Sequence, residues 1–256
     1  MTEAVPVFTT PGPRIREVPV DRAWTWLAAG WNDLIRAPVV SLSYGAILVG
    51  VSFALSLGLW LVNLFYLVLP LAAGFMFVAP LLAIGLYETS RRLGLGLPVT
   101  LADVLAAGRS NRGQIATMGL VLMLFNLAWV RLATLLFALF FPGANPSLEG
   151  LPDLIISTKG MPFLIVGTAI GAALAALVFS ISVVALPLLM DRDVNVFTAI
   201  ATSLTAVQIN YKAMALWAVL IVVFTGFGLA AFYIGLAVTL PLVGHASWHA
   251  YKDIVE

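Results

Sequence analysis

The feature that constrains this chain most is a pair of long segments without a charged side chain. Residues 38–87 contain no Asp, Glu, Lys or Arg, and neither do residues 213–248. About 20 apolar residues cross the hydrocarbon core of a bilayer, so each segment is long enough for two crossings. The whole chain is 62% hydrophobic and 10% charged, whereas soluble domains average about 25% charged residues. We therefore predict an all-α, polytopic helix bundle embedded in the lipid bilayer.

Apolar runs predict the positions of the transmembrane helices. We expect spans over about 38–61, 65–88, 114–141 and 161–190. Residues 211–251 would measure about 60 Å as one helix, twice the thickness of a bilayer core. We therefore expect two short spans there, meeting near 225–228, which gives six transmembrane helices. A single long helix that projects into the cytoplasm, giving five spans, is the alternative.

Three shorter segments have the helical spacing of interfacial amphipathic helices, and they cover about 21–36, 101–112 and 195–209. Trp24 and Trp31 suit the water–lipid boundary in the first, and Thr100 with Asp103 forms a capping-box pattern in the second. Residues 1–19 contain four prolines and are expected to be a flexible N-terminal tail. The remaining residues, 20–256, are expected to form one transmembrane domain.

Short motifs recur in a fixed order and indicate a threefold internal repeat. Leu27-Ala28-Ala29-Gly30 returns as Leu105-Ala106-Ala107-Gly108, each just before a span. Three Pro-Leu motifs fall near the ends of the second spans, at Pro80, Pro187 and Pro241. The repeating unit would be one interfacial helix followed by one transmembrane hairpin.

The positions of Lys and Arg predict the orientation in the membrane. Eleven of the 13 basic residues fall on one side of the six-span arrangement: Arg14, Arg16, Arg22, Arg36, Arg91, Arg92, Arg109, Arg112, Arg192, Lys212 and Lys252. The 142–160 loop on the other side carries only Lys159, together with Glu149 and Asp153. Cytoplasmic loops carry the excess of positive charge, so both termini are expected in the cytoplasm.

Composition also excludes several classes of function. The net charge of +1 argues against a nucleic-acid surface. Without cysteine the chain has no thiolate ligands or nucleophiles. The sequence shows no nucleophile–base pair, no phosphate-binding loop and no intramembrane carboxylate pair. We therefore expect no enzymatic activity and name no catalytic residues and no cofactor.

His245 and His249 are the only histidines, and their i, i+4 spacing is found in many metal sites. They are the candidates for a metal site, although only Asp253 lies nearby in the sequence as a further ligand. A polar, aromatic end to the last helix at the membrane interface explains the same residues. We favour this second interpretation and predict no metal.

Arg131 is the one charge well inside a span, in the outer half of the third. A charged group near the bilayer centre costs about 2.5–3.5 kcal/mol on insertion scales. Its side chain could extend to the outer interface or pair with Glu149 or Asp153. The alternatives are contact with another membrane subunit and a place in a substrate path, so Arg131 is the candidate intramembrane functional residue.

Other polar and small residues have structural interpretations. Glu88 is expected to pair with Arg91 and Arg92 at a helix end. Asn63 and Asn126 are candidates for hydrogen bonds between helices. The Gly167-x-x-x-Gly171 motif permits close helix approach, which fits packing within the chain better than a groove for a partner.

The chain also resembles a bacterial integral-membrane family known only as domain of unknown function 2189. The resemblance rests on residues 29–33 (Ala-Gly-Trp-Asn-Asp), the Pro-Leu-Leu span ends and the closing segment 244–253. It would cover about 20–255 and implies a bacterial, inner-membrane protein. A cytochrome-oxidase-like label on some members implies a respiratory partner, but the resemblance supplies no activity and no site residues.

These observations favour a non-catalytic accessory or scaffold subunit that associates with another membrane complex, such as a respiratory or other bioenergetic one. Apolar spans with little internal polarity and aromatic interfacial helices suit lateral contact in the membrane. A transporter or channel-like protein is the alternative, because discontinuous helices at prolines are compatible with substrate sites. Lipid or envelope homeostasis is a third class.

Overall fold

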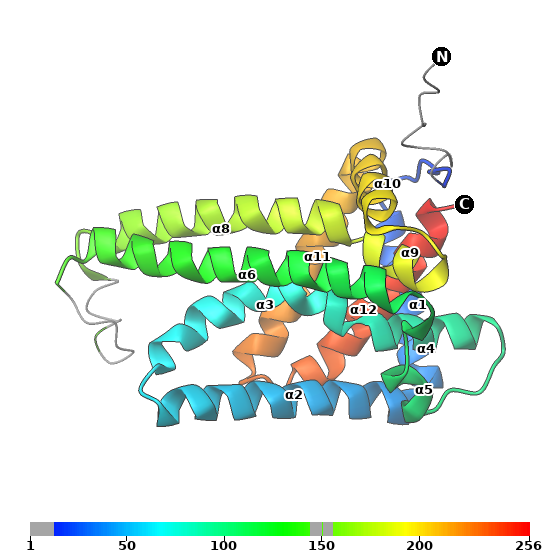
Figure 1. Ribbon diagram of the computed structural model, residues 1–256, viewed down its shortest axis with the longest axis horizontal. Coiled ribbons are helices and arrows are strands. Elements are labelled where there is room, and N and C mark those ends of the chain that lie inside the picture. Colours follow the sequence, from blue (N-terminus) through cyan, green and yellow to red (C-terminus); the bar gives the residue numbers. More distant parts are fainter. Residues whose placement is uncertain (1–12, 144–149, 151–155) are drawn as a thin grey trace, which may run out of the picture.

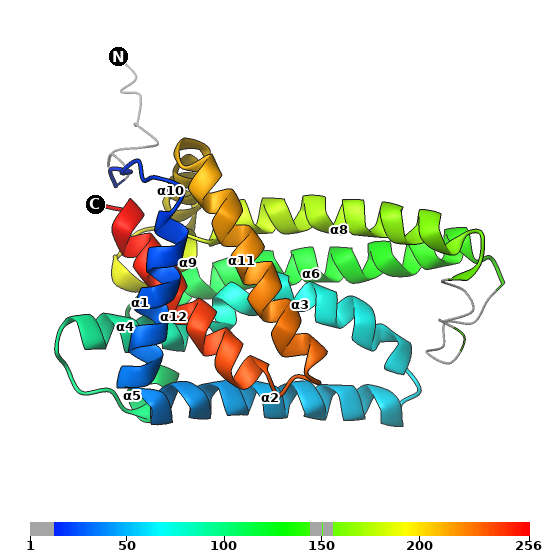
Figure 2. The same cartoon turned by 180° about the vertical axis from the view of Figure 1, so that it is seen from behind.

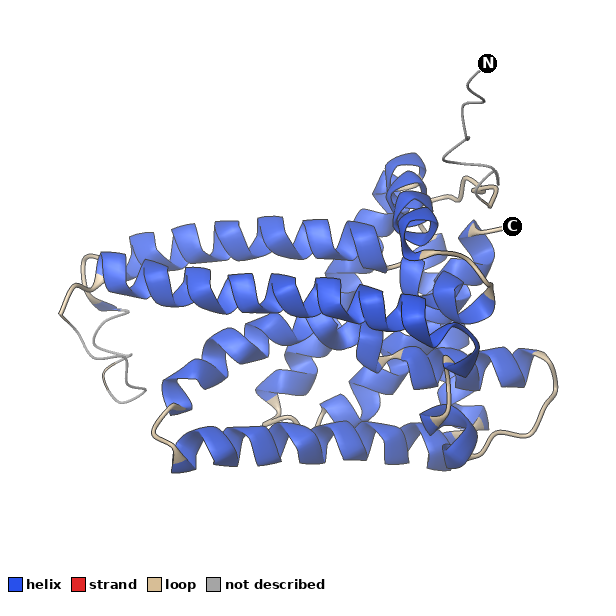
Figure 3. Ribbon diagram, viewed as in Figure 1, coloured by secondary structure: helices blue, strands red, loops and turns tan. Residues whose placement is uncertain are grey.

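The fold is a bundle of helices, as the apolar runs predict. The structure is a computed structural model that describes residues 13–143, 150 and 156–256. Within these residues the only extended pairing is an isolated bridge between Ile15 and Val255, and Figure 3 shows helices joined by short loops. The described helices of four or more residues are α1 (Arg22–Arg36), α2 (Pro38–Leu61), α3 (Val68–Leu82), α4 (Ile84–Gly94), α5 (Leu101–Leu105), α6 (Arg112–Phe140), α8 (Gly160–Ser182), α9 (Ala185–Asp191), α10 (Val196–Ile209), α11 (Tyr211–Ala230) and α12 (Leu236–Ile254).

Five helical segments of the described chain are long and apolar enough to cross a membrane, so the chain is a multi-pass membrane protein. They are Pro38–Leu61, Phe65–Gly94, Leu101–Phe140, Gly160–Asp191 and Tyr211–Ala230. The expected count of six is not confirmed. The stretch 211–251 does divide into two helices, α11 and α12, but the second half of α12 carries His245, His249 and Lys252. Its hydropathy therefore falls below that of the other five.

The helices are arranged around one crowded end. α2, α3, α6 and α8 run along the long axis in Figure 1, and α1, α4, α5, α9 and α10 gather with the chain termini at one end. We call this the polar end. The basic residues grouped by the sequence, from Arg22 and Arg36 to Lys252, lie on elements that begin or finish there. α11 runs away from the polar end, and α12 returns to it (Figure 2).

The hairpin of α11 and α12 lies obliquely across the bundle, and its turn meets α2 part-way along that helix (Figure 2). Tyr233 in the turn packs edge-on against Phe53 of α2 with ring centroids 5.7 Å apart. Phe232 and Tyr233 both have positive φ, 51° and 65°. The sequence placed the break at 225–228, but α11 continues to Ala230, because Gly226 and Gly228 are tolerated inside a helix.

Two of the transmembrane hairpins have an interrupted second helix. α3 ends at Leu82 and α4 begins at Ile84, and α8 ends at Ser182 before α9 begins at Ala185. Pro80 and Pro187 lie close to these breaks and cannot donate a backbone hydrogen bond. Pro241 lies inside α12, which is not interrupted. The order of elements thus agrees with the proposed repeat, but the repeat itself is not confirmed.

Most of the buried core lies at the polar end, where α12 packs against α1, α2, α4 and α11. Glycines permit the close approach of α12 to three neighbours. A Cβ atom on Gly30 of α1 would lie 2.6 Å from the backbone nitrogen of Ala246. One on Gly45 of α2 would collide with the carbonyl oxygen of Ala237, and one on Gly244 would lie 2.5 Å from Leu86 of α4.

The segment before α1 is tied to the end of the chain. The backbone N–H of Arg16 donates to the carbonyl of Ile254 at 2.8 Å, and that of Glu256 donates to Arg14 at 3.0 Å. Asn210 also receives the Val18 N–H at 2.8 Å. Residues 13–19 are therefore anchored, whereas residues 1–12 of the expected tail lie outside the described residues.

Candidate functional site

His245 lies at the centre of the polar end and connects three helices. Its side chain is 0% exposed. Nε2 lies 2.9 Å from the Ser41 hydroxyl of α2, and Nδ1 lies 2.8 Å from the Ser90 hydroxyl of α4. One ring nitrogen donates and the other accepts, so each tautomer satisfies both contacts. The two serines are themselves buried, so this serine–histidine arrangement is closed to any substrate.

His249 pairs with a carboxylate rather than with His245. Its Nε2 lies 2.7 Å from Oδ2 of Asp33 in α1. Burial alone would raise the pKa of Asp33, but hydrogen bonds from His249 and Ser90 outweigh it and hold that pKa below its ordinary value. Among the residues that the structure describes, no three His, Cys, Asp or Glu side chains are placed to hold a metal ion. The two histidines thus contact different helices.

Asp253 closes the contact between the first and last helices. Arg22 of α1 donates two hydrogen bonds to this carboxylate, both of 2.8 Å, and the Trp26 indole N–H donates a third at 2.9 Å. The hydrogen bonds from Arg22 lower the pKa of Asp253, although burial opposes the effect. Asp191 of α9 accepts from the Tyr251 hydroxyl at 2.7 Å. The last turns of α12 are therefore fixed to α1 and α9.

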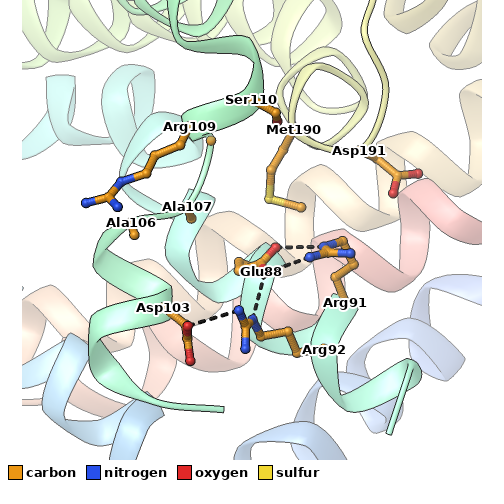
Figure 4. Close-up of a pocket in the computed structure, with 11 residues that line it drawn as sticks. Glu88, Arg91, Arg92, Asp103, Ala106, Ala107, Arg109, Ser110, Met190 and Asp191 are labelled. Carbon is orange, nitrogen blue, oxygen red and sulfur yellow. Dashed lines mark hydrogen bonds and ion pairs between the residues drawn. The ribbon is translucent and has the colours of Figure 1, made fainter. Parts of the chain in front are cut away.

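A polar pocket of about 360 Å³ opens beside this network (Figure 4). Glu88 receives hydrogen bonds from Arg91 and Arg92 as the sequence predicts, at 2.7 and 2.9 Å. Arg92 also pairs with Asp103 at 2.9 Å. Arg109 on the rim extends away from this cluster in Figure 4. Because the charges of the cluster satisfy one another, it holds α4 against α5, and Arg109 is left as a lining charge without an ion pair among the described residues.

Arg131 lies on the outer surface of α6, among exposed leucines. Leu124, Leu127 and Leu135 share its face of the helix and are exposed. Its guanidinium forms no ion pair with any residue that the structure describes. Glu149 and Asp153, the expected loop partners, lie outside the described residues. Arg131 is nine residues, or about 13 Å, from the end of α6 at Phe140.

Asn126 and Trp129, both in the span formed by α6, bond to a neighbouring helix. Asn126 of α6 donates to the carbonyl of Gly74 in α3 at 3.0 Å, which confirms the interhelical role expected for this residue. Trp129 donates to the carbonyl of Pro70 at 2.8 Å and packs against Gly171 of α8. A Cβ atom on Gly167, the other glycine of the small-residue motif, would meet nothing within 4 Å beyond its own helix, so the motif provides one close contact within the chain.

The sequence did not reveal the partners of the polar end. Asp33, Ser41 and Ser90 were not recognised as partners of the histidines, because each comes from a different helix and 204 residues separate Ser41 from His245. The available signal was the concentration of polar residues in 29–33 and 244–253, the segments on which the family resemblance rests. In the structure these two segments pack against each other.

The helices and the location of their polar residues define a polytopic α-helical membrane protein. Residues 68–191, just under half of the chain, match a family described as predicted integral membrane protein, DUF2189. The match runs from α3 to α9 and confirms the resemblance over that segment, although it is narrower than the expected 20–255. The chain has no match among curated proteins and none among solved structures.

Proposed function

We propose that this protein is a non-catalytic accessory or scaffold subunit of a bacterial inner-membrane complex, and that its partner docks against the outer face of α6. Arg131 carries this proposal. Charged residues within transmembrane segments almost always face the bundle interior or a water-filled cavity, where they pair. Arg131 instead faces outward, without an ion pair among the described residues, between Leu127 and Leu135.

The partner that fits this face is a membrane helix with an aspartate or glutamate at the depth of Arg131. Such a carboxylate would form a charge-assisted, bidentate hydrogen bond with the guanidinium. Leu124, Leu127 and Leu135 would pack around the ion pair and exclude lipid headgroups and water. Extension of Arg131 to the outer interface, about 13 Å along the helix, is the competing explanation and requires no partner.

The buried and paired polar side chains of the polar end support a non-catalytic role. Ser41, Ser90 and His245 are buried together, and the carboxylates of Asp33, Asp191 and Asp253 are engaged in contacts between helices. These groups stabilise the bundle. A transporter is less well supported, because Asn126 and Trp129 use their polar atoms to join α3 and α6 rather than to line a path.

The decisive experiment combines gentle extraction with site-specific crosslinking. A photoreactive amino acid at Leu135, close to Arg131 on α6, is compared with one at Leu55 on the exposed face of α2. We expect co-migration with a larger complex on native sizing and an adduct from position 135 only. Arg131→Leu should abolish the adduct, whereas Arg131→Lys should retain part of it. A lone monomer or homo-oligomer that moves solute into liposomes would overturn the proposal in favour of transport.

The orientation is part of the same proposal, with the polar end and both termini in the cytoplasm. The clustering of Lys and Arg on elements at the polar end supports it. The chain contains no cysteine, so single cysteines can be introduced at Glu256 and at Lys159. In intact cells an impermeant thiol reagent should label position 159 and leave position 256 unlabelled. Labelling of position 256 would contradict the orientation.

A further inference from the structure

An apolar cavity lies within the membrane-spanning part of the bundle, apart from both Arg131 and the polar pocket. It measures about 360 Å³ and is bounded by α3, α4, α8, α11 and α12. This volume falls within the range of about 300–1,000 Å³ that is typical of small-molecule sites. Its lining is almost entirely aliphatic and aromatic, with contributions from Phe75, Ala175, Val222 and Leu240.

The cavity opens sideways toward the lipid. Ala172 and Ala176 of α8, and Val219 and Val222 of α11, belong to its lining and are exposed on the outside of the bundle. α11 runs obliquely, whereas α8 follows the long axis, so the two helices diverge (Figure 2). A molecule already dissolved in the bilayer can therefore enter without passing through water.

Four hydroxyl side chains line the cavity, and two of them, those of Tyr87 and Thr225, make no hydrogen bond with the residues that the structure describes. Tyr87 lines the cavity and is 2% exposed, and its hydroxyl makes no hydrogen bond with any residue that the structure describes. Ser182 and Ser247 also line the cavity, but their hydroxyls donate to carbonyls of their own helices, at 2.7 and 2.8 Å. Thr225 can turn its hydroxyl to its own helix in the same way. A tyrosine hydroxyl is too far from its own backbone to do so, so the Tyr87 hydroxyl can bond only to a neighbouring group or to a molecule in the cavity.

The polarity of the cavity follows its depth. Tyr87 directly precedes Glu88, whose ion pairs belong to the polar end. Phe75 lies twelve residues earlier, about 18 Å toward the opposite side along α3 and α4. The cavity thus has the Tyr87 hydroxyl near the polar boundary and a mostly apolar body below it, to which Thr225 of α11 contributes one further hydroxyl. An acylated lipid has the same order of polar and apolar parts.

We infer that the cavity binds the acyl chain of a membrane phospholipid, with the Tyr87 hydroxyl donating a hydrogen bond to the ester carbonyl. The chain would enter between α8 and α11, and its headgroup would remain at the polar boundary. This inference is independent of the accessory role, because it involves neither Arg131 nor the outer face of α6.

The test uses purified protein in vesicles of phosphatidylethanolamine and phosphatidylglycerol, with a trace of phosphatidylglycerol that carries a diazirine in its acyl chain. After irradiation, peptide mapping should place label on buried cavity-lining positions such as Phe77 and Leu240, well above label on Leu55 of α2. Ala175→Phe, which fills the cavity, should remove most of this label. Ala218→Leu fills the cavity from the opposite wall and serves as a second variant if the first does not fold.

The matched control is Ala169→Phe, the same substitution on α8 at an exposed position outside the cavity lining, and it should label as the unmodified protein does. Tyr87→Phe should lower the amount of phospholipid retained through detergent extraction. Equal label on the cavity and on outer faces, or an unchanged pattern in folded Ala175→Phe protein, would overturn the inference. Removal of the label by an isoprenoid quinone at concentrations where added phospholipid has no effect would overturn the assignment to an acyl chain.

Discussion

His249 Nε2 lies 2.7 Å from Oδ2 of Asp33, although 216 residues separate them. The pair joins the last helix of the bundle to the first. On the same surface Gly30 is packed against the backbone of Ala246, and Arg22 holds Asp253 with two hydrogen bonds of 2.8 Å. The contact between α1 and α12 therefore joins the first and last described helices of the fold.

The first prediction concerns Gly30. Gly30→Ala should destabilise the protein by about 1–3 kcal/mol, because the new methyl group collides with the backbone of α12, which cannot rotate away. Gly50→Ala is the matched control, since a Cβ atom on Gly50 in α2 would meet nothing within 4 Å beyond its own helix. This variant should be as stable as the unmodified protein or slightly more stable. Thermal unfolding of both variants in detergent measures the difference. Equal stability of the two variants would show that α1 and α12 are less closely packed in solution than in the structure.

The second prediction is a loss of stability in acid that depends on Asp253. Its pKa is lowered in the folded state by hydrogen bonds from Arg22. A lowered carboxyl pKa stabilises the fold fully above the unfolded value of about 3.9, and the stabilisation disappears as pH falls through the lower, folded value. Asp33 shifts in the same direction and adds to the effect. At pH values below about 4, the unfolding temperature should therefore decrease.

Asp253→Asn should lower the unfolding temperature at neutral pH and make it less dependent on pH below about 4. Asp193→Asn provides the control, because Asp193 is exposed and forms no ion pair with the residues that the structure describes. If the unfolding temperature of Asp253→Asn depends on acid pH as strongly as that of the unmodified protein, other carboxylates cause the loss of stability in acid.

The third prediction concerns the buried contacts of His245. His245→Phe should destabilise the protein by about 2 kcal/mol or more, because the buried Ser41 hydroxyl loses its partner in a dry environment, while Ser90 keeps its hydrogen bond to Asp33. Adding Ser41→Ala should recover part of that loss, since replacing both partners of a hydrogen bond with apolar groups is often nearly neutral. The free energies of unfolding of the single and double variants form the test. A double variant no more stable than His245→Phe would show that packing of the imidazole, rather than its hydrogen bond to Ser41, matters here.

The helices could be predicted from the sequence because a bilayer imposes a simple requirement on apolar length. The first span was expected over 38–61, and α2 has these bounds. The expected capping box of Thr100 and Asp103 is present, as are the ion pairs of Glu88. All of these features depend on residues within four positions of one another or on continuous hydropathy, so they can be recognised without knowledge of the tertiary structure.

Long-range contacts could not be predicted in this way. His245 and His249 have the spacing of metal ligands, yet the first contacts Ser41 and Ser90 and the second contacts Asp33. Which side chain meets each imidazole depends on how α1, α2 and α4 pack around α12, and local periodicity does not encode this. The apolar cavity was missed for the same reason, because its walls come from five helices and most of each wall resembles ordinary lipid-facing surface.

The fourth prediction concerns the turn between α11 and α12. Phe232 has φ of 51° and is 82% exposed, so its side chain makes little contact that would offset an unfavourable backbone. The left-handed conformation costs a residue with a Cβ roughly 1–2 kcal/mol, whereas glycine adopts it readily but loses about 0.5–1 kcal/mol of entropy on folding. Phe232→Gly should therefore raise the free energy of unfolding by about 0.5–1 kcal/mol.

Tyr233 is the control for this prediction, because it has the same backbone conformation but packs against Phe53 with centroids 5.7 Å apart. An edge-on aromatic pair contributes about 0.5–1.5 kcal/mol beyond the burial of its area. In Tyr233→Gly the stabilisation lost with the ring should therefore equal or exceed the stabilisation gained from the relaxed backbone. The two glycine variants should therefore differ in sign or clearly in size when unfolding is followed in the same detergent. A destabilised Phe232→Gly protein would mean that the exposed ring is itself anchored, by lipid or by a partner, and that this anchorage exceeds the backbone cost.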